Sequence, residues 1–411
     1  MGLSQGWRRI LLAGATLAVG LSFSAGCSLV AEDAAEREAS TGTGAGGSEK
    51  TGAESGNAAG GNPGQNLGEI KGLYVPGFKA EEELARMAGI GRETEINALV
   101  IDVKDGGYLT YPSEIPLANE IDATTEQIPD LEDYVQRVHD EDLYAIARLA
   151  VFQDDALPAA RPELAAQDSS TGGPWYNYSG SAWTNPYQKE VRDYNIAVAK
   201  EAAEAGFDEI QFDYVRFPSD GEMANLEYGE ETFPSQEATI AAFLEDAQRE
   251  LEPTGAMVSA DVFGLVGVND DVGIGQVVSE MAPHLDVISP MVYPSHYPVG
   301  SYGYENPDRE PYDIVKYAMD DFISKGREAN PDLIVRPWLQ DFEYLSDYSS
   351  EDVRAQMEAT YDSGLGGWIL WNASGDYTLS AIEGGEKIAG AQNAAGTENT
   401  GAEADDAQYS Q

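Results

Sequence analysis

The chain has 411 residues, of which 72 are acidic and 24 are basic, and its formal net charge is −48. This balance excludes nucleic acid as a partner, because binding a phosphate backbone requires a basic surface. An apolar share of 42% is enough for a packed core, whereas one cysteine and three histidines supply neither a disulfide nor the ligand spacing of a zinc site, so we expect no metal and no cofactor.

Residues 1–26 have the pattern of a secretory signal. Arg8 and Arg9 precede the apolar run 10–23, which is too short for an ordinary membrane span, and small residues lead up to Cys27. The segment resembles the lipoprotein signal of bacteria, although Ser24 stands where leucine is usual. We therefore expect export, with a lipid on Cys27 anchoring the protein to the outer face of the cell membrane. The alternative is a plain cleaved signal, which would leave the protein secreted.

Residues 27–68 and 389–411 consist largely of small and polar residues with almost no aliphatic side chains. Such segments cannot bury enough apolar surface to fold, so we expect a flexible linker and a disordered tail. The folded domain should then span residues 69–388. Acidic residues are spread throughout this domain, which is typical of a solvated surface rather than of a site.

Within the domain, short β-rich runs alternate with helical patterns. Helices are expected over 186–205 and between Ser350 and Gly364, from apolar residues spaced three and four apart. Eight such repeats predict a single-domain (β/α)8 TIM barrel; the alternative, an open doubly wound sheet, lacks its Gly-rich fingerprint after the first strand. The predicted strands are 72–78, 96–105, 143–152, 207–217, 257–264, 285–293, 333–342 and 366–372.

Two aspartates at strand ends are the candidate catalytic pair. In TIM barrels the reactive groups lie at the carboxyl ends of the strands. Side chains alternate along a strand, so Asp213 should face the barrel interior opposite Phe212, and Asp261 should do so opposite Ala260. Two carboxylates flanking a sugar bond are what glycoside hydrolysis needs, one as acid and the other as nucleophile or base.

Other assignments of these carboxylates remain open. Asp213 could instead form an ion pair with Arg216 or Arg148, and Asp102 could pair with Lys104, because an inward carboxylate must be hydrated, paired or functional. Asp341 could instead supply the second catalytic carboxylate. It follows Gln340 directly, however, and successive side chains of a strand point to opposite faces, so Asp341 would face away from the barrel interior unless the strand ends before it.

Further candidates contact substrate rather than react with it. They lie at strand ends or in the aromatic, Gly-rich loops that follow, and aromatic faces stack on the apolar faces of sugar rings. Filling of the core is the alternative for each aromatic side chain. The expected substrate-binding residues are Asp102, Lys104, Arg148, Trp175, Trp183, Arg216, Tyr293, His296, Gln340, Asp341, Trp371 and Asn372.

Five runs in the region of the predicted strands stand out: Gly72–Val75, Val100–Asp105, Phe212–Pro218, Ser259–Gly264 and Ile288–Pro294. Together they resemble a bacterial family of inferred glycosyl hydrolases, formerly a domain of unknown function. The resemblance covers nearly the whole folded domain and implies a hydrolase-type barrel that acts on a polysaccharide at the cell exterior. A broader likeness to chitinase-like barrels stops at strand four, where Val215 occupies the place of their glutamate acid.

These observations together predict an exported glycoside hydrolase, with a polysaccharide or oligosaccharide as substrate and the membrane as a partner only through the lipid. The competing hypothesis is a non-catalytic glycan-binding lipoprotein, which would share the aromatic loops but need no carboxylate pair. A metal-dependent deacetylase would need a ligand cluster that three scattered histidines do not provide.

Overall fold

The computed structural model describes residues 67–382. The expected signal segment 1–26, Cys27, nearly all of the expected linker 27–68 and the expected tail 389–411 therefore lie outside the described residues. No helix in the part of the chain that is described has the length and apolar character needed to cross a membrane.

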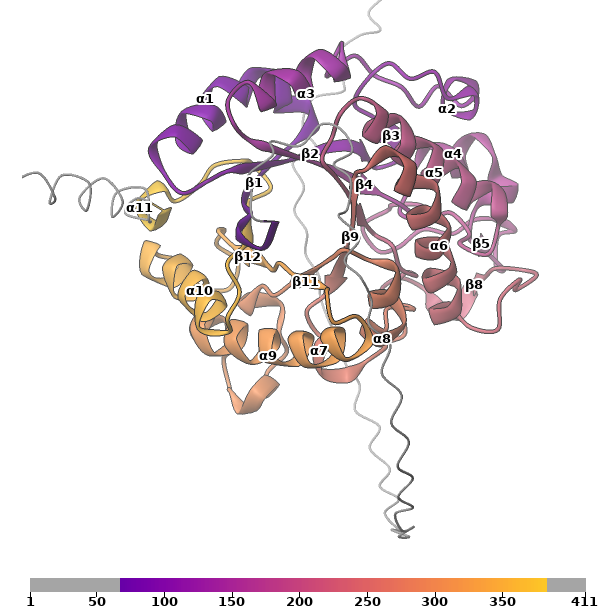
Figure 1. Ribbon diagram of the computed structural model, residues 1–411. Helices are drawn as coiled ribbons and strands as arrows, with labels where there is room; N and C mark the ends of the chain where they lie inside the picture. The colour runs from indigo at the N-terminus through magenta and orange to yellow at the C-terminus, as the bar shows by residue number, and fades with distance from the viewer. Residues whose placement is uncertain (1–66, 383–411) are drawn as a thin grey trace, which may run out of the picture. The chain divides into compact units, whose positions relative to one another are not determined.

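Eight parallel strand positions close into a ring, as the sequence predicts for a TIM barrel (Figure 1). The last strand pairs with the first through Lys71–Trp368, Gly72–Ile369 and Leu73–Leu370, which closes the barrel. The seventh position consists of two short pieces. In ring order the strands are β1 (Lys71–Val75), β2 (Ala98–Asp105), β4 (Tyr144–Ala150), β7 (Glu209–Asp213), β9 (Met257–Phe263), β10 (Val287–Met291), β11 (Ile334–Val335) with β12 (Trp338–Gln340), and β13 (Trp368–Trp371).

Helices surround this ring on its outer side (Figure 1). The longer ones are α1 (Ala80–Glu93), α3 (Leu131–His139), α5 (Lys189–Glu204), α6 (Gln236–Leu251), α9 (Pro311–Ala329) and α10 (Ser350–Asp362). Short elements occupy the loops: α2 (Pro116–Glu120), α4 (Ala156–Ala160), α7 (Val266–Asn269), α8 (Val278–Met281), α11 (Leu379–Ile382), β3 (Tyr108–Leu109), β5 (Gln167–Asp168), β6 (Gly173–Pro174) and β8 (Leu226–Glu227).

The two helices expected from the sequence are present, with one shifted start. α10 begins as expected, because the Ser349 side chain and Asp352 form a capping box. α5 begins at Lys189 rather than at Pro186. Asn185, which precedes the expected start, is used in the turn before the helix: its side chain accepts from the Tyr187 amide and donates to the Tyr228 carbonyl.

Alternating side chains divide the apolar residues into two cores. In β7, Ile210 and Phe212 belong to the core between strands and helices, where Phe212 packs against Phe243 of α6. The smaller core lies inside the barrel and includes Tyr74, Ile146 and Trp338. The predicted parity of β7 is therefore confirmed, and Glu209, Gln211 and Asp213 point inward.

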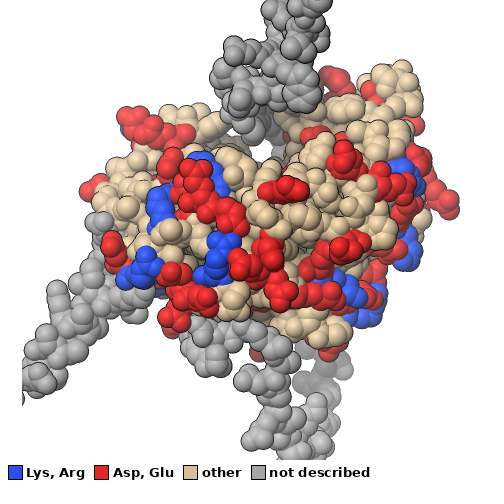
Figure 2. Space-filling view, turned by 90° about the horizontal axis from the view of Figure 1, so that it is seen from above, with Lys and Arg blue, Asp and Glu red and all other residues tan. Residues whose placement is uncertain are grey.

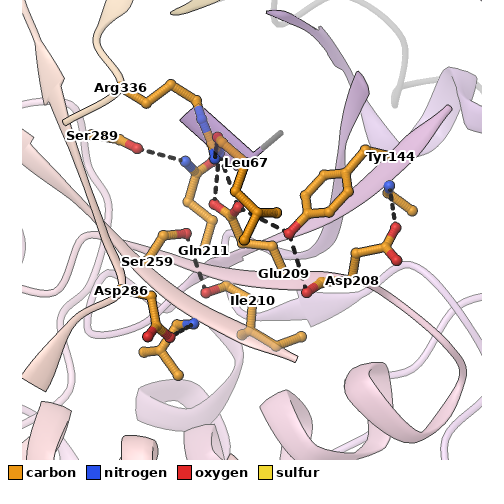
Figure 3. Close-up of polar contacts among 12 residues, drawn as sticks. Leu67, Tyr144, Asp208, Glu209, Ile210, Gln211, Ser259, Asp286, Ser289 and Arg336 are labelled. Carbon is orange, nitrogen blue, oxygen red and sulfur yellow. Dashed lines mark hydrogen bonds and ion pairs between the residues drawn. The ribbon is translucent and has the colours of Figure 1, made fainter. Parts of the chain in front are cut away.

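The inward side chains of β7 begin with an ion pair at the amino-terminal end of the barrel (Figure 3). Arg336 donates from Nη1 to both carboxylate oxygens of Glu209, at 3.0 and 2.9 Å, and neither residue is exposed. Nη2 of Arg336 also donates to the Leu67 carbonyl, at 3.4 Å. One layer above, Nε2 of Gln211 donates to Ser289. The interior is thus closed from below by polar groups, and the site lies at the opposite end.

Acidic side chains prevail over basic ones on the outer surface (Figure 2). The face seen there carries many red Asp and Glu side chains and fewer blue Lys and Arg side chains, spread over it rather than gathered at one place. Such a surface repels other polyanions at low ionic strength.

Candidate active site

Asp213 ends β7 and is held by Arg148 of the neighbouring strand β4. Nε and Nη2 of Arg148 donate to Oδ2 of Asp213, at 3.0 and 2.5 Å. Oδ1 accepts from the amide of Tyr214 at 2.6 Å. Tyr214 has a φ of 49°, so the chain turns sharply at this residue and brings its own amide to the carboxylate. Three N–H groups therefore bind the Asp213 carboxylate and fix its orientation.

The same arginine also holds Asp102. Nη1 of Arg148 donates to Oδ1 of Asp102 at 2.5 Å, and the Tyr74 hydroxyl donates to Oδ2 at 2.6 Å. Burial raises the pKa of Asp102 to about 6, against the opposing effect of Arg148. Burial alone would lower the pKa of Arg148, but the charges of Asp213 and Asp102 raise it well above its ordinary value. Of the ion pairs considered for Asp213, Arg148 is thus the partner.

The expected pair of Asp102 with Lys104 is wrong. The pairing of β2 with β4 shifts register between these two residues, and this irregularity turns Lys104 out of the barrel. Its Nζ lies 2.8 Å from Asp154 and donates to Asn195 of α5 at 3.1 Å, without any exposed side-chain surface. Lys104 therefore fastens a helix to the barrel and does not face the site.

Asp261 lies on β9, the strand next to β7. Gln211 pairs with Ser259 and Phe212 with Ala260, so one further step along this register brings Asp213 level with Asp261. Nε1 of Trp338 donates to Oδ1 of Asp261 at 2.6 Å. Burial raises the pKa of Asp261 well above its ordinary value, and the nearby charge of Asp213 raises it further.

Two aromatic side chains from the expected set border these carboxylates. Tyr293 is buried in the core inside the barrel. Burial raises its pKa, and the charges of Asp261 and Asp213 raise it further. Trp371 is half-buried, and its ring lies 4.2 Å from that of Tyr74 and 5.4 Å from the Arg148 guanidinium. Trp371 is therefore the partly open aromatic surface beside the arginine.

Trp175 and Trp183 are only 1% exposed and offer no open face to a sugar. Trp175 packs closely against Gly221, and its Nε1 donates to the Glu222 carbonyl at 3.2 Å. Trp183 lies with its ring against the Arg216 guanidinium, 4.8 Å from the ring centre. The loops after β4 and β7 also form a small sheet of β5, β6 and β8.

Exposed aromatic residues occur instead on other parts of the loops that follow the strands. Phe78 is 67% and Tyr178 71% exposed, and the loops after β1, β2, β4 and β12 each carry at least one such residue. None of them was among the expected substrate-binding residues, although Tyr176 and Tyr178 lie in one of the aromatic loops expected to bind a sugar and the others lie shortly after a strand end. They are Phe78, Tyr108, Tyr176, Tyr178 and Tyr344.

Three of the expected substrate contacts, Gln340, Asp341 and Asn372, instead fix the strand-end loops. Oε1 of Gln340 accepts from Oγ and the amide of Ser295, at 2.8 and 3.2 Å. The Asp341 carboxylate accepts from the Thr378 hydroxyl and amide, and its carbonyl accepts from Asn372. Asp341 therefore does not take the place of Asp261. His296 remains exposed and stacks on Tyr344 with ring centres 5.3 Å apart.

Arg216 lies close to the pair but does not bind Asp213. Three aromatic rings enclose its guanidinium, those of Trp183, Tyr214 and Phe263. Burial lowers the pKa of Arg216, although the charges of Tyr214, Asp213 and Asp220 oppose this change. No group of three or more His, Cys, Asp or Glu side chains among residues 67–382 could hold a metal ion.

Comparison with solved structures finds glycosidase-like barrels. The glycoside hydrolase domain of PgaB (BpsB) from Bordetella bronchiseptica is 11% identical over 74% of this chain and 94% of that one, with a TM-score of 0.55. The β-galactosidase of Marinomonas ef1 is 12% identical over 80% of this chain and 60% of that one, with a TM-score of 0.53. A hypothetical protein from Ruminiclostridium thermocellum ATCC 27405 is 37% identical over 46% and 97%, with a TM-score of 0.42.

Comparison of the sequence with protein families gives the more direct result, whereas a search among curated proteins finds no match. Residues 72–377 match the family described as "Putative glycosyl hydrolase domain". The match runs from the first to beyond the last strand of the barrel and includes both Asp213 and Asp261. The resemblance seen in the strand runs is thereby confirmed: the chain belongs to this glycosyl hydrolase family.

Proposed function

We propose that the protein is an exported glycosidase in which Asp213 and Asp261 cleave a glycosidic bond of an extracellular or cell-envelope polysaccharide. The observation that carries this proposal is the contrast between two inward carboxylates on adjacent strands. Asp213 receives three N–H donors, whereas burial and the neighbouring charge raise the pKa of Asp261. Catalytic acid and base assignments follow from such opposed environments.

In the proposed reaction, protonated Asp261 donates its proton to the glycosidic oxygen while Asp213 attacks the anomeric carbon. The bond to the leaving sugar breaks, and a glycosyl ester forms on Asp213. Asp261, now ionised, takes a proton from water, whose oxygen displaces the ester and restores both side chains. Adjacent strands are about 4.8 Å apart, which favours the carboxyl separation of about 5 Å in retaining enzymes over the wider spacing of inverting ones.

The surrounding groups have supporting tasks in this proposal. Arg148 orients Asp213 and stabilises its negative charge, while Asp102 and Tyr74 hold the arginine in place. Trp371 and the exposed loop aromatics offer ring faces for stacking on sugars. Export and a lipid on Cys27 would place the barrel at the cell surface, where a polysaccharide is accessible. Fractionation of cells that produce the natural chain or Cys27→Ala tests this part.

The catalytic assignment is tested by Asp213→Asn and Asp261→Asn, assayed for release of reducing ends from a panel of polysaccharides. Each variant should lose at least about 1,000-fold in kcat, since each removes a group that takes part in bond breaking. Asp286→Asn is the matched control: this half-buried carboxylate lies at the other end of the barrel and accepts from the Val258 amide, as an asparagine oxygen also can.

Three outcomes of this test differ in meaning. Activity retained by both variants at native-like melting temperatures would refute the pair. Hydrolysis by the natural chain with inversion at the anomeric centre, seen by NMR of the first product, would make Asp213 a base rather than a nucleophile. Tight glycan binding without any release of sugar by the natural chain would establish the glycan-binding lipoprotein instead.

A further inference from the structure

Arg216 is a nearly buried cation without a carboxylate partner. Its side chain is at the turn after β7 and the residue is 7% exposed. The centres of three rings lie within 5.2 Å of its guanidinium carbon: Phe263 at 4.5 Å, Trp183 at 4.8 Å and Tyr214 at 5.2 Å. No ion pair joins Arg216 to any residue between 67 and 382. Such burial of a cation is costly unless something compensates it.

The guanidinium uses only one of its nitrogens within the described chain. Nη1 donates to the Phe217 carbonyl at 2.9 Å and lies 3.5 Å from Oγ of Ser219. Nε and Nη2 have no partner among residues 67–382. Nε of Arg192 and Nε of Arg336 are both unpaired and sealed from solvent, but neither nitrogen of Arg216 is among such sealed atoms. The unpaired edge of Arg216 is therefore reachable from solvent.

The corresponding edge of another arginine in the same site, Arg148, already binds a carboxylate. Arg148 binds Asp213 through its own Nε and Nη2. The two N–H groups on that edge are nearly parallel and match the two oxygens of a carboxylate, which a lysine cannot reproduce. The rings around Arg216 hold the guanidinium plane in place before any ligand arrives, so little conformational entropy is lost on binding.

The position of Arg216 relates it to the reacting groups. It follows Asp213 by one turn of chain, and Phe263, which stacks on it, ends the strand that carries Asp261. The charge of Asp213 acts on Arg216 without a direct contact. An anion bound to Arg216 would thus lie next to the sugar whose bond is cleaved, and not on a remote surface.

We propose that Arg216 binds the carboxylate of a uronic acid residue, so that the polysaccharide substrate is a polyuronate or carries uronate residues beside the cleaved bond. This proposal rests on the glycosidase function for its setting but concerns recognition, which can be measured without hydrolysis. The acidic outer surface does not itself attract a polyanion, so Arg216 supplies the local attraction.

The test measures binding of oligosaccharides to Asp213→Asn by calorimetry, since this variant should not consume them. The probes are tetrasaccharides of galacturonate, glucuronate and mannuronate, and the same tetrasaccharides after reduction of their carboxyl groups. At least one uronate series should bind about 10- to 100-fold more tightly than its reduced counterpart, the range expected for charge-assisted hydrogen bonds. Adding Arg216→Gln should remove this difference and leave the reduced series nearly unaffected.

Arg137→Gln serves as the control, because this arginine is exposed on α3 and paired with Glu81 and Asp133. Equal affinities for uronate and reduced oligosaccharides, no binding of any uronate, or preference for amino-sugar oligosaccharides would each overturn the proposal. A preference for sulfated oligosaccharides that Arg216→Gln removes would reject the carboxylate in favour of sulfate. Hydrolysis by the natural chain is scored separately, so failure of the glycosidase function and failure of uronate recognition are distinguishable.

Discussion

Arg148 donates two hydrogen bonds to a single oxygen of Asp213, and its third nitrogen reaches Asp102 on the other side. One buried cation thus binds two nearly buried carboxylates, and the exposed Asp105 carboxylate also lies 3.7 Å from it. This arrangement fixes the orientation of Asp213, but the positive charge of Arg148 is shared with other carboxylates. The site therefore keeps an excess of negative charge, which would stabilise the positive charge that develops on the sugar in the transition state.

Arg148→Lys should lower kcat by at least about 10-fold, because the single nitrogen of an ammonium group cannot supply both donors to Oδ2 of Asp213 and also reach Asp102. Arg148→Met should in addition destabilise the fold by about 3–5 kcal/mol, since it leaves buried carboxylates unpaired. Steady-state kinetics and urea denaturation measure the two effects. Arg137→Lys, on the exposed face of α3, should alter neither. Full activity in Arg148→Lys would contradict the positioning role.

Trp338→Phe should move the alkaline limb of the pH–rate profile to higher pH. The indole N–H hydrogen bond lowers the pKa of Asp261, so removing it raises that pKa and keeps the proposed acid protonated to higher pH. Trp368→Phe is a matched control, because its Nε1 donates to Tyr361 on the outer side of the barrel. An alkaline limb at the same pH in Trp338→Phe as in the natural chain would contradict the assignment of Asp261 as the catalytic acid.

Asp102 should make the protein less stable as the pH rises through about 6. Its pKa is raised from 3.8 to about 6 in the folded state, so the folded protein binds this proton more tightly than the unfolded chain does. The resulting stabilisation is complete below pH 3.8 and lost above pH 6, and it amounts to about 3 kcal/mol. Asp102→Asn lacks this dependence.

Urea denaturation of the natural chain and of Asp102→Asn at pH 4 and pH 7 measures this effect. The free energy of unfolding of the natural chain should fall relative to that of the variant over this interval. A difference between the two proteins that is the same at both pH values would show that the pKa of Asp102 is not raised.

Glu209→Gln should destabilise the barrel by about 3–5 kcal/mol, because Arg336 would remain buried without a counter-charge (Figure 3). The double variant Glu209→Gln/Arg336→Met should regain much of this loss. Denaturation curves of the two variants measure both effects. Catalysis should be largely preserved in the double variant, since the pair lies below the site. A single variant as stable as the natural chain would show that the ion pair adds nothing.

The barrel was predictable from the sequence because its signal is repeated eight times. Each apolar run could be assigned to a strand, and the alternation in β7 correctly turned Asp213 inward. The side chain of Lys104 was wrongly expected to face the site, because a single irregularity in the strand between Asp102 and Lys104 reverses the alternation of side chains. No residue type at this position indicates the irregularity. The role of Arg148 depends on three strands meeting, which needs the register as well as the pattern.

Loop residues were harder to place than strand residues. Trp175 and Trp183 lie in a polar, Gly-rich segment that looks open in the sequence, but both side chains are buried. In the same region β5 pairs with β8, which comes from the loop after β7 and is distant in the chain. Phe78 is the only aromatic residue between β1 and α1, so no local pattern marked it, and Tyr344 lies between Phe342 and Tyr348, from which the sequence does not distinguish it. Their exposure follows from the path of the chain, which composition does not report.

The level register of β7 and β9 has a consequence for folding. If β7 slipped by one residue, every side chain on it would change faces, and Phe212 would enter the barrel while Asp213 turned toward the helices. A slipped barrel could still be compact and helical, but its two reacting groups would no longer meet. The activity recovered after refolding would therefore measure the fraction of molecules with the native register of β7. Circular dichroism would not distinguish these molecules from those with a shifted register.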